Sequence, residues 1–101
     1  MASRLELQKM LEEILGSRNV YFQPPSSIKM KYPAIVYSLD RIDQWHSDND
    51  VHMSWNGYNL TYIDSNPDNE NVNKLSKLPR CRFDRFYTSD NLNHYTFTLY
   101  Y

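Results

Sequence analysis

The chain has 101 residues, with two glycines, one cysteine and nine tyrosines, and a formal net charge of −1 at pH 7. This length allows one domain with a single modest core, and the nearly neutral charge argues against a strongly basic nucleic-acid binder. A lone cysteine excludes an internal disulfide, and so few glycines leave no Gly-rich phosphate loop.

The first predicted element is an amphipathic helix over residues 3–15, with Ser3 as its N-cap. Gly16 stands where a helix C-terminus favours a residue free to adopt positive φ. Its apolar face is formed by Leu5, Met10, Leu11, Ile14 and Leu15. A short strand follows at Val20–Phe22 and ends before two prolines. Both elements therefore precede a loop that extends to about residue 31.

Two longer strands are predicted in the middle of the chain. Residues 34–39, after Tyr32-Pro33, are apolar on both faces, which is typical of a strand with neighbours. Residues 51–63 form a long strand interrupted near Asn56-Gly57, which is either a bulge or a tight hairpin turn that would divide the strand in two. The stretch between them is polar. We expect residues 44–51 to form a projecting loop with Trp45 as an aromatic anchor for a partner.

The last third of the chain combines a helix with a hairpin. Val72, Leu75 and Leu78 recur at helical spacing and predict a helix over residues 68–78, capped by Asp68 or Asn69. Strands follow at residues 81–88 and 93–101, joined by a turn at 89–91. The sequence therefore predicts a single α+β domain of order α-β-β-β-α-β-β. Two helices would pack on a mainly antiparallel sheet, with Leu60 and Phe97 buried.

Charge is distributed unevenly along the chain. Acidic residues predominate between positions 40 and 70, with Arg41 as the one basic residue, and basic residues predominate between 74 and 85, with Asp84 as the one acidic residue. The two patches are either solvated faces or the two sides of a head-to-tail subunit contact. The candidate contact residues are Asp64, Asp68, Glu70, Lys77, Arg80 and Arg82. The many tyrosines could serve the sheet or a subunit contact.

No pattern of catalytic or metal-binding residues is evident. Cys81 lies between two arginines, but the strand alternation favours a small buried hydrophobe over a nucleophile. The spacing of His46, Asp48, Asp50 and His52 matches no established metal site. We therefore expect no enzyme, no cofactor and no metal. Without a secretory segment or an apolar run of membrane length, we expect folding in a reducing cytoplasm.

The order of these elements resembles the tail terminator (tail completion) proteins of long-tailed bacteriophages. The resemblance is carried by the N-terminal helix, by VYFQPP, by YPAIVYSL, by the YNLTYIDSNPD strand and break, and by the closing YTSDNLNHYTFTLYY hairpin. It implies a compact subunit of a hexameric ring that caps the tail tube and joins it to the head connector. Assembly in the host cytoplasm and a final place in the virion follow from the same resemblance.

The resemblance also implies a lumen through which DNA passes without specific binding. An acidic wall would suit this, because carboxylates repel phosphates, and residues 40–50 could supply it. The candidate partner or lumen residues are Asp43, Trp45, Asp48 and Asp50. The alternatives are another neck component, such as a head-closure or minor capsid protein, and a small protein-binding module. A small enzyme built on Cys81 or the histidines is a third class.

Overall fold

A computed structural model of the chain describes residues 4–47 and 50–101, with side chains described outside residues 43–54. Two helices and five strands follow one another in the predicted order. They are α1 (Arg4–Leu15), β1 (Val20–Phe22), β2 (Ala34–Ser47), β3 (Asp50–Asp64), α2 (Asn71–Ser76), β4 (Cys81–Ser89) and β5 (Leu92–Tyr100). The α+β class and the element order are thus confirmed.

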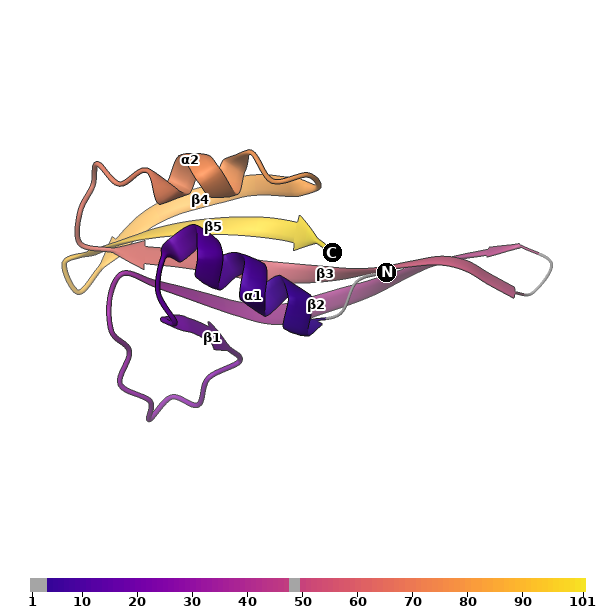
Figure 1. Cartoon of the computed structure of the whole chain (residues 1–101), viewed down its shortest axis with the longest axis horizontal. Coiled ribbons are helices and arrows are strands. Elements are labelled where there is room, and N and C mark those ends of the chain that lie inside the picture. The colour runs from indigo at the N-terminus through magenta and orange to yellow at the C-terminus, as the bar shows by residue number, and fades with distance from the viewer. Residues whose placement is uncertain (1–3, 48–49) are drawn as a thin grey trace.

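The strands form one sheet in the order β1-β2-β3-β5-β4 (Figure 1). β1 pairs with β2 in parallel, and all other neighbours are antiparallel. In this register Tyr37 faces Leu60, and Leu60 faces Phe97 on the other side. Because alternate residues of a strand point to opposite faces, these three side chains share one face of the sheet.

Both helices cover that face. Leu7, Leu11 and Leu15 of α1 and Leu75 of α2 are buried in the same cluster as the inward-facing side chains of the sheet. Leu60 is 0% exposed and Phe97 1%, so the predicted strand register is confirmed. Each such apolar side chain stabilises the fold by about 1.5–3 kcal/mol relative to an exposed one.

Local hydrogen bonds and backbone conformation set the ends of the two helices. Gly16 has φ 78°, and its N–H donates to the Glu12 carbonyl at 2.9 Å, as predicted for a helix C-terminus. The second helix is shorter than predicted, because side chains of the preceding turn hold its backbone. Asn66 Oδ1 accepts from the N–H of Asp68, and Asn69 Oδ1 accepts from the N–H of Val72. These bonds compete with a longer helix. The N-cap residue is Glu70, which makes no side-chain cap hydrogen bond, so neither Asp68 nor Asn69 occupies the predicted N-cap position.

The paired strands β2 and β3 continue beyond the helix-covered body as a projecting hairpin arm, which comprises residues 39–47 of β2 and 50–56 of β3 (Figure 1). β5 pairs with β3 only from Gly57 to Asp64, so β2 is the strand partner of the outer part of β3. The longest extent of the molecule is accordingly 52 Å, against 28 and 23 Å. The prediction of a loop over residues 44–51 is therefore wrong, because strand β2 extends to Ser47 and strand β3 begins at Asp50.

Gly57 lies inside a continuous β3. Of the two predicted alternatives at Asn56-Gly57, a bulge or a hairpin turn, the hairpin turn is therefore excluded. The bulge belongs to the facing strand, where the register shifts between Leu39 and Arg41. A Cβ on Gly57 would lie 2.8 Å from Cγ of Arg41 and 3.1 Å from Cε1 of Tyr100. Glycine is required here because two side chains pack over its backbone.

Candidate assembly surfaces

Asp64 is a structural residue of the turn after β3. It is 8% exposed, and its Oδ2 accepts a hydrogen bond from the Tyr62 hydroxyl at 2.7 Å. Its Oδ1 accepts from the N–H of Asn66 at 3.0 Å. Burial and this carboxylate raise the pKa of Tyr62. Because its side chain is buried, Asp64 is a poor candidate for the subunit contact predicted from the sequence.

The other acidic candidates and the first basic one lie at opposite ends of α2. Asp68 and Glu70 precede the helix, and Lys77 follows it; all three are exposed. The structure therefore separates the acidic and basic groups by the length of this helix. Their side chains can contact a neighbour, but they do not contact one another.

Arg80 and Arg82 are exposed at the start of β4 and are already engaged within the protomer. The guanidinium of Arg80 lies 4.3 Å from the Trp55 ring centroid, and its Nε donates to the Tyr100 carbonyl. Arg80 thereby ties the β3–β2 arm to the end of β5. Arg82 Nε is 3.2 Å from Asp84 Oδ1 in an exposed pair, which contributes about 0–1 kcal/mol.

The arm carries the remaining candidates. Asp43 and Trp45 lie on β2, paired with Trp55 and Met53, and Asp50 begins β3 opposite Ser47. The side chains of Asp43, Trp45 and Asp50 lie outside the described part of the structure, and so does the whole of Asp48. The arm does project from the body, as expected for a partner-binding segment, while its proposed contacts stay predictions.

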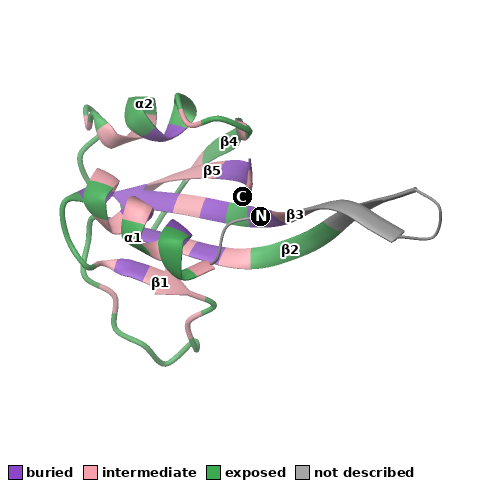
Figure 2. Ribbon diagram, turned by 45° about the vertical axis from the view of Figure 1, so that its right-hand side comes forward, coloured by how far each residue is buried: buried purple, intermediate pink, exposed green. Residues whose placement is uncertain are grey.

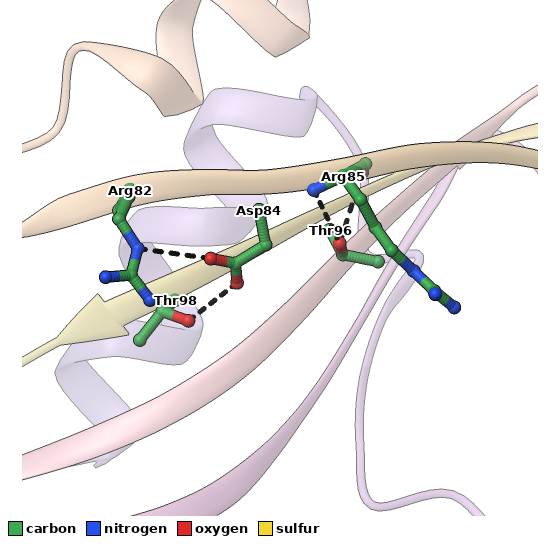
Figure 3. A network of polar contacts seen from close by, with 5 residues as sticks. All are labelled: Arg82, Asp84, Arg85, Thr96 and Thr98. Atoms are coloured by element: carbon green, nitrogen blue, oxygen red, sulfur yellow. Dashed lines mark hydrogen bonds and ion pairs between the residues drawn. The ribbon is translucent and has the colours of Figure 1, made fainter.

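A polar network on strands β4 and β5 was not predicted from the sequence (Figure 3). Asp84 accepts a hydrogen bond from the Thr98 hydroxyl at 2.6 Å on one oxygen and from Arg82 on the other. The Thr96 hydroxyl both accepts from the Arg85 N–H and donates to the Arg85 carbonyl. These bonds fix a register shift between Phe83 and Arg85. These residue types carry no sequence signal for a bulge, so it is recognised only from the pairing of β4 with β5.

The described residues offer little for catalysis or metal binding. Burial, with a smaller contribution from Asp84, raises the pKa of Cys81 to about 11, so its thiol stays protonated near neutral pH. His94 stacks on the Tyr87 ring at 4.7 Å between centroids and lies 3.1 Å from the Leu92 carbonyl. No group of three histidines, cysteines or carboxylates that could hold a metal occurs within the described residues.

Comparison with known proteins gives no family for the chain. No protein-family model matches it, and no curated protein sequence matches it either. Among the helices of the described residues, none is long and apolar enough to cross a membrane.

Proposed function

We propose that the chain is a structural subunit of a bacteriophage neck, a tail-terminator-like protein that forms a ring on the tail tube and joins it to the head connector. The observation that carries this proposal is the hairpin arm. It extends a sheet that already has a core, whose buried residues are purple in Figure 2, and the helices cover the body of the sheet but not the arm (Figure 1).

The base of the arm supports an intermolecular role. Leu39 is 42% exposed and Ile42 56%, although both belong to a well-paired strand. Exposed apolar side chains on a rigid element contribute nothing to the core but lose water when a partner covers them. An element that extends from a stable body with such side chains suits a contact with a neighbouring subunit.

The charge of the same segment suits a DNA conduit. Residues 40–50 contain four aspartates and one arginine. A ring that carries these segments toward its lumen repels DNA phosphates and lets DNA pass without being retained. The hexameric stoichiometry and the virion location come from the resemblance of the sequence to tail terminators. We propose a non-catalytic role, without cofactor or metal.

Electron microscopy of the purified chain, combined with native mass spectrometry over a concentration series, tests the proposal. We expect closed rings with an open lumen, and we expect them to bind the ends of tail tubes assembled from the tube protein of the same genome. A chain that stays monomeric both alone and in the presence of those tubes would contradict the ring and would favour a protein-binding module. Rings that bind the portal side instead would indicate a head-closure protein.

A further inference from the structure

Two strands of the described structure end the sheet with an unpaired edge. β4 is the outermost strand on one side over its whole length, Cys81–Ser89. On the other side β1 covers only part of β2, because its pairing runs from Val20 to Phe22 against residues 35–37. The outer edge of β2 is therefore unpaired from Asp40 onward. Unpaired edges carry free N–H and C=O groups that can pair with another strand.

Both edges carry the same four-residue pattern, an Asp-Arg pair between two apolar residues, and in both the pattern contains a register shift. The β2 edge motif is LDRI at residues 39–42, and the β4 edge motif is FDRF at residues 83–86. Each contains a register shift across its aspartate. The four apolar side chains are also similarly exposed, at 42% for Leu39, 56% for Ile42, 46% for Phe83 and 51% for Phe86.

The two motifs present these side chains in the same orientation. Leu39 pairs with Tyr58 and Phe83 with Phe97, so both belong to the helix-covered face. Each arginine lies near a tyrosine ring, with Arg41 6.0 Å from the Tyr100 centroid and Arg85 4.9 Å from that of Tyr87. The register places both rings on the opposite face. The arginine and the apolar members of each motif are thereby separated by face.

We propose that β4 of one copy pairs antiparallel with the β2 arm of a second copy, motif against motif. Aligned antiparallel, Leu39 faces Phe86, Asp40 faces Arg85, Arg41 faces Asp84, and Ile42 faces Phe83. The pairing is confined to these four positions, and residues 87–89 diverge from β2, because β1 and the Gln23 side chain occupy the preceding part of its outer edge. Every charge meets its opposite and every apolar side chain meets another. A parallel alignment would place aspartate against aspartate and arginine against arginine. The pattern therefore specifies both the partner and the direction.

The topology makes this contact head-to-tail. Three antiparallel steps separate β2 from β4, so the two strands run in opposite directions within one sheet. An antiparallel contact between β4 and the next β2 keeps the second copy in the same direction, with its helices on the same face. The second copy then offers its own free β4, and such heterologous contacts close into rings when the rotation permits. Bulges bend and twist strands, which supplies curvature.

Charges and bulges also occur on edges that natural proteins protect from association. The distinguishing feature here is the pair of half-exposed apolar residues that flanks each bulge. On β4 they continue the core outward, with Phe83 5.5 Å from Phe97 and Phe86 5.1 Å from Tyr95 between ring centroids. A second strand would extend the core over them, whereas a protected edge would place charges there.

The inference deepens the proposed ring, and charge exchange across the contact tests it. The variants are Arg85→Glu, Asp40→Lys and the double variant, studied by native mass spectrometry and sedimentation velocity. Each single change sets like charges opposite each other, so we expect the apparent dissociation constant to rise at least about tenfold. The double variant restores an opposite pair and should recover most of the assembly. The Thr96 bonds of residue 85 involve its backbone, so the β4–β5 pairing should persist.

Glu13→Lys and Arg18→Glu are the matched controls, because both residues are exposed and lie outside the edge motifs. Controls that weaken assembly equally, or a double variant without recovery, would overturn the inference. Weakening by Arg85→Glu without any effect of Asp40→Lys would indicate β4–β4 pairing and would also overturn it. A wild-type chain that stays monomeric would overturn it as well.

The outcomes for the ring and for the strand contact differ. Rings that all three variants form normally would leave the proposed function intact and refute the strand contact. Open chains that follow the predicted charge pattern would support the strand contact and refute the closed ring.

Discussion

The helix-covered body and the hairpin arm are two parts of one sheet with different chemistry. In the body, Tyr37, Leu60 and Phe97 line up across three strands and are at most 1% exposed. At the base of the arm the same β2 strand exposes Leu39 and Ile42 by about half. The backbone pairing with β3 continues, with a register shift between Leu39 and Arg41, while the burial ends. Stability therefore resides in the body, and the arm is available for contact with another molecule.

The largest effect should come from a change to the body. Phe97→Ala leaves a cavity among buried side chains and should lower the free energy of unfolding by about 3–5 kcal/mol. Ile42→Ala removes an apolar side chain of comparable chemistry from the exposed arm and should cost no more than about 0.5 kcal/mol. Urea denaturation of both variants measures the difference. Similar losses would mean that the arm belongs to the cooperative core.

A smaller effect is expected where the arm joins the body. Gly57→Ala places a methyl group against Arg41 and Tyr100, which must move, and should cost about 1–2 kcal/mol in thermal or urea unfolding. Arg41→Ala removes the closer of the two contacts. The double variant should therefore be more stable than the sum of the single effects predicts. Strict additivity would show that the crowding against Arg41 is not the cause.

The body was predictable from the sequence because its burial follows simple periods. Leu11 and Leu15 recur at helical spacing on α1, and the alternation through Phe97 and Leu99 fixes the register of β5. The predicted apolar face of α1 was wrong at Leu5, which is 68% exposed, and omitted Leu7, which is buried. The length of α2 was not predictable in the same way. Its apolar spacing extends to Leu78, but the Asn66 side chain binds the N–H of Asp68 before the helix begins, and the Asn69 side chain binds the N–H of Val72 in its first turn.

The arm could not be predicted as a hairpin because neither of its faces is covered by the body. Strand prediction depends on an apolar face, and a two-stranded ribbon in solvent has none. The edge motifs were visible as LDRI and FDRF, but only the sheet order shows that both lie on unpaired edges. The charge contact between subunits stays a prediction, although Asp64, one of its six residues, is buried in a turn.

The most direct test of this account is to make the base of the arm polar and measure stability and assembly on the same protein. The double variant Leu39→Ser/Ile42→Ser removes two apolar side chains that are exposed and lie outside the buried core cluster. We predict a Tm within about 4 °C of the wild type, together with loss of ring formation. A large fall in Tm, or rings that form as before, would contradict the assignment of stability to the body and assembly to the arm.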